Sequence, residues 1–129
     1  MPAISEGVAD RVKKYLDKAI SMDENNIIAN LSKGIWHAEI INQAGKTLAA
    51  ALYGARTEIA KKHFEKVYNL NSNEIGVLYE LSYGYFLLGN DEDLEVSLKL
   101  INKLIKLSEI SHLAKLYKEK AVKLKSKIN

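Results

Sequence analysis

The sequence predicts an all-α protein built as an array of helical hairpins. Apolar residues recur at steps of three and four along nearly the whole chain, which is the spacing of one face of a helix. Helix breakers are scarce, with one proline and seven scattered glycines among 129 residues, so long helices joined by short turns are favoured. A chain of this length is expected to form one domain, over residues 1–129.

Turn and capping residues divide this pattern into about six helices. Clusters of asparagine, aspartate, serine and glycine interrupt the apolar spacing at about residues 23–26, 71–73, 89–91 and 108–111. Such residues end one helix and cap the next. The repeat helices are predicted over about 5–22, 26–54, 57–70, 74–89 and 91–107, and a C-terminal capping helix over about 111–127.

The second predicted helix is unusually long, and the first has a short apolar stripe. In the second, small and apolar residues alternate at steps of four and three from Ile27 to Leu52 without a slip, which predicts one elongated helix over 26–54. At about 1.5 Å per residue it would be about 40 Å long. In the first helix, the residues expected to be buried are Val8, Val12, Tyr15, Leu16 and Ala19.

An internal repeat supports the hairpin array. The third helix carries Ala60-x3-Phe64, and the fifth carries apolar residues at the same spacing 34 residues later, at Leu94 and Leu98. Thirty-four residues is the period of the tetratricopeptide repeat, a helix pair whose second member carries an Ala-x3-Phe signature. The sequence therefore predicts a tetratricopeptide-like array in which the elongated second helix holds an insertion.

The predicted inner surface of this array is apolar. In a helical-repeat array the inner helices line an extended concave surface, and an exposed apolar surface of this kind marks an interaction site. We therefore expect a groove that binds a peptide or helix of a protein partner. The alternative is that the short array closes on itself, or that a terminal helix fills the groove. The predicted groove residues are Ile28, Leu31, Ile35, Glu39, Tyr79, Tyr83 and Phe86.

A second contact site is predicted on the extension of the second helix. Leu48, Leu52 and Tyr53 are apolar, and a helix end that projects into water has no physical reason to be apolar. We expect a partner or a second copy of the chain to cover them, with a weak homodimer as the simplest consequence.

The chain lacks the usual machinery of an enzyme. It has no cysteine, which excludes disulfides, a thiolate nucleophile and a Cys-ligated zinc site. His37 and Glu39 come nearest to a catalytic pair, but side chains two positions apart on a helix do not face each other. We therefore predict neither catalytic residues nor metal ligands, and no cofactor.

Charge and hydropathy narrow the partner classes. The net charge is +3, and lysines gather in the last predicted helix over 115–127. Cations favour helix C-termini and keep a terminal helix solvated, and arginine is scarce, so we expect no nucleic-acid partner. The alternative for this helix is binding to nucleic acid or an anionic membrane. No apolar run approaches the about 20 residues of a transmembrane helix. As the sequence stands the protein is expected in the cytoplasm, or outside it if a leader was trimmed.

Three blocks of the sequence resemble a known family. They are residues 34–39 (Gly-Ile-Trp-His-Ala-Glu), 48–54 (Leu-Ala-Ala-Ala-Leu-Tyr-Gly) and 63–67 (His-Phe-Glu-Lys-Val). Over about residues 10–125 the chain is similar to the repeat domain of the regulator of microtubule dynamics family and its uncharacterised bacterial relatives. The resemblance implies the helical-repeat fold and assigns no role to a single residue.

The sequence as a whole favours a non-enzymatic adaptor for protein–protein interaction. A small-molecule or lipid-binding protein, with the groove closed into a pocket, is the alternative. A third hypothesis is an enzyme built around His37 and Glu39. The sequence specifies no further catalytic residues for it.

Overall fold

The computed structural model describes residues 6–71, 73–108 and 111–128, and the regular elements within these ranges are all helical. The predicted all-α class is therefore confirmed. Five helices begin and end within two residues of their predicted bounds, and the second is the exception. The elements are α1 (Glu6–Met22), α2 (Ile27–Ala44), α3 (Lys46–Leu48), the π-helical turn η1 (Ala49–Tyr53), α4 (Thr57–Leu70), α5 (Ile75–Leu88), α6 (Asp91–Ile105) and α7 (His112–Ile128).

Polar caps and one glycine position the central turns. The Asn26 side-chain oxygen accepts a hydrogen bond from the Ala29 N–H at 3.0 Å, and that of Asn90 accepts one from the Asp93 N–H at 3.1 Å. These bonds satisfy backbone donors that a first helical turn leaves unpaired. Gly89 ends α5 with φ +79°, a left-handed conformation that glycine adopts without steric cost. The chain can therefore reverse at once from α5 into α6.

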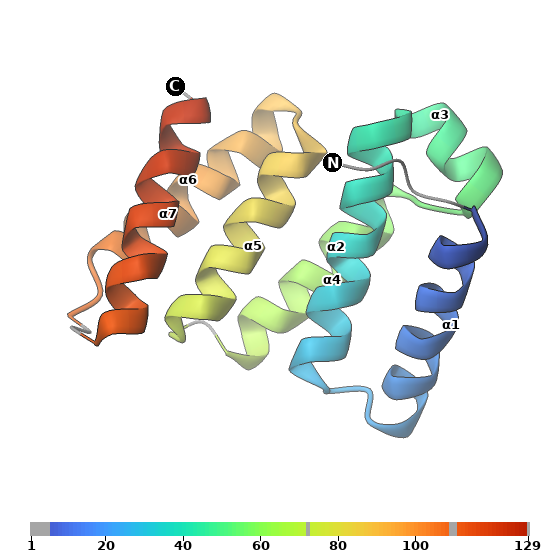
Figure 1. The fold of residues 1–129 in the computed structure, drawn as a ribbon, viewed down its shortest axis with the longest axis horizontal. Helices are drawn as coiled ribbons and strands as arrows, with labels where there is room; N and C mark the ends of the chain where they lie inside the picture. Colours follow the sequence, from blue (N-terminus) through green and yellow to red (C-terminus); the bar gives the residue numbers. More distant parts are fainter. Residues whose placement is uncertain (1–5, 72, 109–110, 129) are drawn as a thin grey trace.

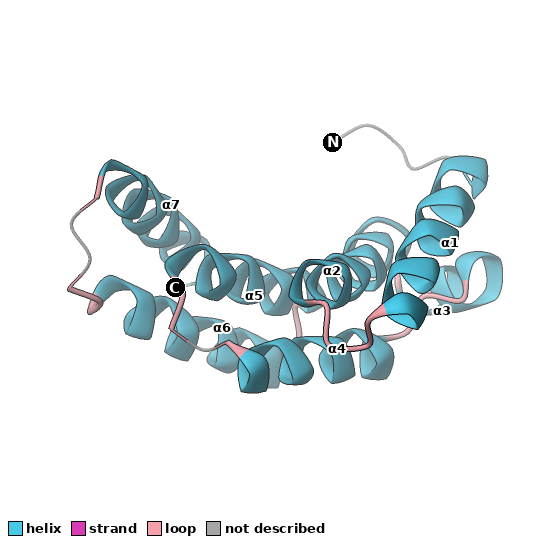
Figure 2. Cartoon of the chain, turned by 90° about the horizontal axis from the view of Figure 1, so that it is seen from below, coloured by secondary structure: helices cyan, strands magenta, loops and turns pink. Residues whose placement is uncertain are grey.

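The helices form two curved rows (Figures 1 and 2). The inner row consists of α1, α2, α5 and α7, and the outer row consists of α3 with η1, α4 and α6. Helix α2 packs on α4 and α5 packs on α6, while α2 and α5 contact each other in the middle of the inner row. The inner row is concave because α1 and α7 rise at its two ends.

The predicted single helix over 26–54 is wrong. Helix α2 ends at Ala44, and Gly45 turns the chain with φ +82° while its N–H donates to the Ile41 carbonyl at 2.8 Å. The next residues form α3 and η1, which lie beside α1 in the outer row (Figure 2). The apolar spacing continues across Gly45, so periodicity alone could not reveal the break. Glycine permits the turn because it has no Cβ atom.

Phe64 lies where α2, α4 and α5 meet, and its side chain is fully buried. A Cβ atom added to Gly34 would lie 2.4 Å from its Cε1, and one added to Gly84 would lie 2.4 Å from its Cζ. The ring therefore occupies space that only two glycines can leave open. Its other neighbour is the Tyr85 ring, with 5.1 Å between the ring centroids.

Two buried positions of α6 lie one residue earlier than the repeat spacing predicts, whereas Ile101, also in the predicted stripe, is fully buried. Leu94 and Leu98 are only half-buried, whereas Asp93 and Ser97 are fully buried. Ser97 donates to the Ser82 carbonyl at 2.7 Å, and the Asp93 carboxylate lies 3.2 Å from the ammonium group of Lys61 on α4. Asp93 and Ser97 thus take the buried places in the core that the predicted frame assigned to Leu94 and Leu98. The Ser97 hydroxyl is hydrogen-bonded and the Asp93 carboxylate is ion-paired, and buried polar groups usually have such partners.

We predict that substitutions at the Phe64 contact are strongly destabilising. Phe64→Ala should lower the free energy of unfolding by about 3–5 kcal/mol, because it empties a fully buried aromatic site. Gly84→Ala should lower it by about 1–3 kcal/mol through overpacking, despite the higher helix propensity of alanine. Chemical denaturation measures both effects.

The control for this prediction is Gly7→Ala on α1, where an added Cβ atom meets nothing within 4 Å. It should leave stability unchanged or raise it slightly. Phe64→Leu shortens the side chain at the contact and should remove most of the cost of Gly84→Ala in a double-mutant cycle. Additive effects of the two substitutions would show that the ring does not hold α5 at this distance.

Candidate functional site: the concave face

The concave face is formed by the accessible strips of α2 and α5. Both helices lie in the middle of the inner row with packed neighbours on their other sides, so each leaves one strip open. Ile28, at one end of the α2 strip, is 77% exposed, and the other groove residues predicted from the sequence are half-buried. The fold thus brings together on this face Ile28, Leu31, Ile35 and Glu39 from α2 with Tyr79, Tyr83 and Phe86 from α5.

An apolar trough of about 440 Å³ runs between α1 and α2 on this face. Its wall on α1 comes from residues that the sequence pattern assigned to the core. Val8 is 48% exposed and Val12 is 41% exposed, and Tyr15 on the same stripe is also exposed, so that prediction is wrong for these three residues. Among the described helices α1 is the last of the inner row, so none of them lies beyond it to cover the stripe. The trough is lined by Val8, Ala9, Val12, Leu16, Ser32, Ile35, Trp36, Glu39 and Ile40.

A hydrogen bond joins the two accessible strips. The Tyr83 hydroxyl on α5 donates to Oε1 of Glu39 on α2 at 3.1 Å. Burial, together with the charge of Glu39, raises the pKa of Tyr83 to about 12, so the phenol keeps its proton and remains the donor. Glu39 Oε2 is shielded from solvent and has no hydrogen-bond partner. The floor of the concave face therefore contains a carboxylate that is only partly satisfied.

The C-terminal helix covers one end of the concave face. Tyr79 of α5 packs on Tyr117 of α7, with 5.7 Å between the ring centroids. The Lys120 ammonium group lies over both rings, 5.3 Å from that of Tyr79 and 5.8 Å from that of Tyr117. Self-filling by a terminal helix, the alternative foreseen from the sequence, thus occurs at Tyr79, while the trough beside α1 stays open.

His37 and Glu39 do not form a reactive pair. The His37 ring is buried, and its Nδ1 accepts a hydrogen bond from the Arg56 N–H at 3.0 Å. Burial lowers the pKa of His37 to about 4, so the ring is neutral at physiological pH and its proton is on Nε2. Nε2 is itself buried without a partner. Glu39 instead bonds to Tyr83, so the pair offers no route for proton transfer to a ligand.

Other polar clusters in the described ranges serve packing. His63 Nδ1 pairs with the Asn30 side-chain oxygen at 2.9 Å, and the Asn30 amide donates to the Glu24 and Asn26 carbonyls in the turn before α2. Within residues 6–71, 73–108 and 111–128, no group of three or more histidine, aspartate or glutamate side chains could hold a metal ion. No helix in these ranges is both long and apolar enough to span a membrane.

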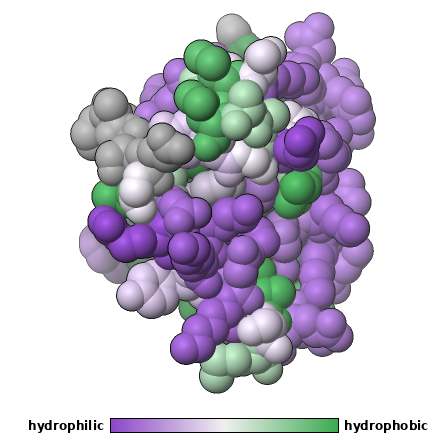
Figure 3. Space-filling model, turned by 90° about the vertical axis from the view of Figure 1, so that its right-hand side faces the viewer, coloured by the Kyte–Doolittle hydropathy of each residue, from purple (hydrophilic) through white to green (hydrophobic). Residues whose placement is uncertain are grey.

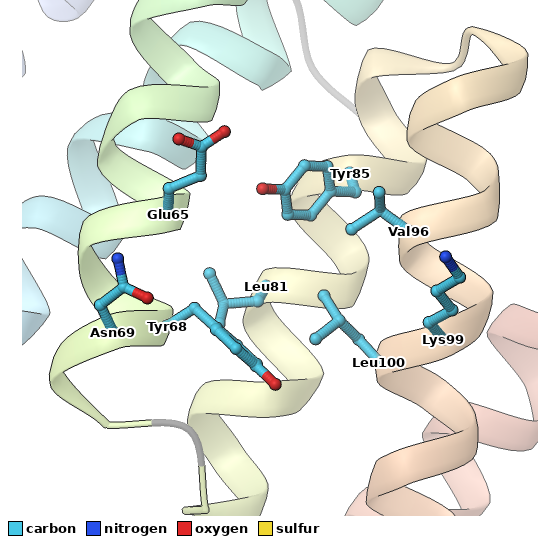
Figure 4. A pocket seen from close by; sticks show the side chains of 8 residues that line it. All are labelled: Glu65, Tyr68, Asn69, Leu81, Tyr85, Val96, Lys99 and Leu100. Carbon is cyan, nitrogen blue, oxygen red and sulfur yellow. The ribbon is translucent and has the colours of Figure 1, made fainter.

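A second cavity, of about 320 Å³, lies on the convex side (Figure 4). It separates α4 from α6 and is floored by Leu81 and Tyr85 of α5. Periodicity could not reveal it, because it arises from the spacing of two outer helices. The only sequence signal is Tyr68, an aromatic residue on the outer face of an amphipathic helix. The walls of this cavity are formed by Glu65, Tyr68 and Asn69 from α4 and by Val96, Lys99 and Leu100 from α6.

Comparison with known proteins does not assign the chain to a family. No protein-family profile, curated protein or solved structure matches it. The resemblance to the regulator of microtubule dynamics family therefore stays a prediction.

The α3–η1 segment exposes the apolar residues predicted as a second contact site. Leu48 and Leu52 are each 54% exposed, whereas Tyr53 is half-buried and lines a cavity beside α1. Figure 3 views this end of the molecule, and apolar surface gathers near its top, at the height of α3 and η1 in Figure 1. The residues thus lie on a packed outer segment and not on a projecting helix.

We predict that Leu48 and Leu52 promote weak self-association. The double substitution Leu48→Glu/Leu52→Glu should shift a concentration-dependent equilibrium toward monomer, because it places charge in an apolar contact. Sedimentation velocity of both proteins over a range of concentrations measures this. If the wild type is monomeric at every concentration, the segment is not a homodimer interface.

We also predict that His37 makes the fold sensitive to acid. Its pKa is about 4 in the folded state and about 6.5 in the unfolded chain, so between these values the unfolded state binds more protons. Stability should therefore fall by about 3 kcal/mol as pH drops from about 6.5 to 4. His37→Asn keeps an acceptor for the Arg56 N–H and removes the titration. Denaturation of both proteins across this pH range should show a shallower slope for the variant, and equal slopes would refute the assignment.

Proposed function

We propose that this chain is a non-enzymatic, tetratricopeptide-like adaptor that binds a peptide or helix of a protein partner on its concave face. The observation that carries the proposal is the open trough between α1 and α2. Its wall on α1 is an exposed apolar stripe, and its wall on α2 continues with Ile35 and Ile40. Contiguous exposed apolar surface on a soluble domain is typical of an interaction site.

The arrangement of the helices supports a repeat-type adaptor. The pairs α2 with α4 and α5 with α6 each contribute one helix to the inner row and one to the outer row. In helical-repeat proteins, stacked pairs of this kind create an extended concave surface that binds partners. The Phe64 contact sets the distance between the two inner helices, so the surface is built before a partner arrives.

The residues that line the trough are suited to binding a peptide and not to catalysing a reaction. Its lining is apolar except for Ser32 and Glu39, and Glu39 is held by Tyr83. Apolar anchors with few polar groups provide affinity and orientation for a bound segment. A nucleophile with an adjacent base, which catalysis by proton or group transfer would need, is not among these lining residues.

A second candidate function is the binding of a small amphipathic molecule in the convex cavity between α4 and α6. Its volume of about 320 Å³ lies within the range of ligand pockets, and polar groups of Glu65, Asn69 and Lys99 surround an apolar floor (Figure 4). Native mass spectrometry of the purified chain distinguishes the two functions, because a pocket ligand adds a defined small mass and an adaptor does not.

We predict that charge placed in the trough abolishes peptide binding without unfolding the protein. Peptides selected on the wild type from a random display library should lose affinity at least about a hundredfold for Val12→Glu and for Ile35→Glu, because each buries an unpaired carboxylate in the contact. Fluorescence anisotropy with the selected peptides measures the affinity, and circular dichroism checks the fold.

The matched control is Val122→Glu on α7, which introduces the same charge at a similarly exposed valine. Val122 lies two positions after Lys120 and so points away from the concave side of its helix. Its affinity should equal that of the wild type. If the selected peptides bind the wild type, Val12→Glu, Ile35→Glu and Val122→Glu equally well, the docking site lies outside the trough.

A further inference from the structure

The floor of the concave face carries two carboxylates. Glu39 lies on the accessible strip of α2 and bonds to Tyr83, and the half-buried Glu80 of α5 acts through its charge on the same tyrosine. Besides accepting the Tyr83 hydrogen bond, Glu39 acts through its charge on this phenol, and Glu80 does so more weakly. Of these two acids, which we call the acidic floor, Glu39 lines the trough between α1 and α2 and Glu80 does not.

Within the part of the chain that the structure describes, neither carboxylate forms a salt bridge. Glu39 Oε2 is buried without a hydrogen bond, and none of the ion pairs among the described residues involves Glu39 or Glu80. Burial raises the pKa of Glu80, and the opposing charge of Lys120 does not cancel this effect. An incompletely paired, partly desolvated carboxylate is unfavourable in the free protein, and a cationic group on a bound ligand relieves the cost.

The lysines nearest the trough each contact another side chain of the protein. Lys33 pairs with Asp17, and Lys13 lies over the Trp36 ring, 5.9 Å from its centroid. Lys120 lies over the rings of Tyr79 and Tyr117. Glu39 is the one charged residue among the described residues that line the trough, so electrostatic complementarity at this point selects a positively charged group on the partner.

The apolar wall on α1 has the geometry of a helix ridge. Val8, Val12 and Tyr15 are spaced by four and three residues, so their side chains form one row along the accessible side of α1. The strip of α2 that faces the trough repeats this spacing at Ile28, Ser32 and Ile35. Two parallel ridges with a trough between them receive the ridge of a third helix.

We propose that the concave face selects a basic amphipathic helix, whose apolar ridge packs between Val12 and Ile35 and whose lysine or arginine pairs with Glu39. This inference rests on the proposed function and narrows it to one class of partner segment. The basic side chain reaches the Glu39 carboxylate past the rim of the trough, while Tyr83 continues to hold Oε1. Glu80 adds a second, weaker attraction for positive charge further along the floor.

The test uses the full chain as bait for a display library of random 16-residue peptides. Peptides selected on the wild type should be enriched in lysine and arginine and should show an apolar period of three to four residues. Synthetic copies of the selected peptides should bind Glu39→Gln at least about tenfold more weakly than the wild type, because a charge-assisted hydrogen bond is lost. The glutamine oxygen can still accept the Tyr83 hydrogen bond, so the fold is kept.

Two controls separate this inference from the proposed function. Glu95→Gln removes an exposed carboxylate from α6 in the outer row and should leave the affinity unchanged. A peptide whose basic residues are replaced by glutamine should bind the wild type and Glu39→Gln equally. If selected peptides lack basic residues, or if Glu39→Gln binds as tightly as the wild type, the acidic floor is not a specificity element, although docking in the trough stands. If Val12→Glu binds every selected peptide unchanged, both proposals are overturned.

Discussion

The closeness of α2 and α5 at the Phe64 ring is the constraint from which the rest of the structure follows. Two glycines, Gly34 and Gly84, leave room for the ring, and a methyl group at either position would lie within 2.4 Å of it. With Phe64 inserted from the outer row, α4 lies beneath both inner helices and holds them at a fixed separation. Each inner helix then has neighbours on every side except the concave one. The concave face is therefore a consequence of core packing, and it exists without a ligand.

The ends of the inner row determine how that face can be used. At the C-terminal end, α7 covers part of it through Tyr117, which packs on Tyr79. At the other end the chain breaks at Gly45, so α3 and η1 lie beneath α1 in the outer row and the inner side of α1 stays free. This asymmetry places the open trough beside α1. It also places Glu39, whose Oε2 is buried without a hydrogen bond, at the boundary between the trough and the α5 strip.

Much of the helical architecture could be predicted, because capping and turn residues act locally. Asn26 and Asn90 cap the helices that their sequence positions indicate, and a hydrogen bond joins Tyr83 and Glu39, two of the residues predicted for the inner surface. The break at Gly45 was missed because an apolar period contains no information about backbone dihedral angles. The stripe of α1 was assigned to the core because periodicity identifies an apolar face and not what covers it. The convex cavity depends on the distance between α4 and α6, which is a tertiary property.

The account depends on the concave face being the surface that meets a partner. Backbone amide NMR of the full chain, titrated with a peptide selected on it, tests this most directly because it reports on every helix at once. The account predicts shift changes on the inner sides of α1, α2 and α5, centred on Val12, Ile35 and Tyr83. Changes confined to α4 and α6 around Tyr68 and Leu100 would contradict it and would place recognition on the convex side.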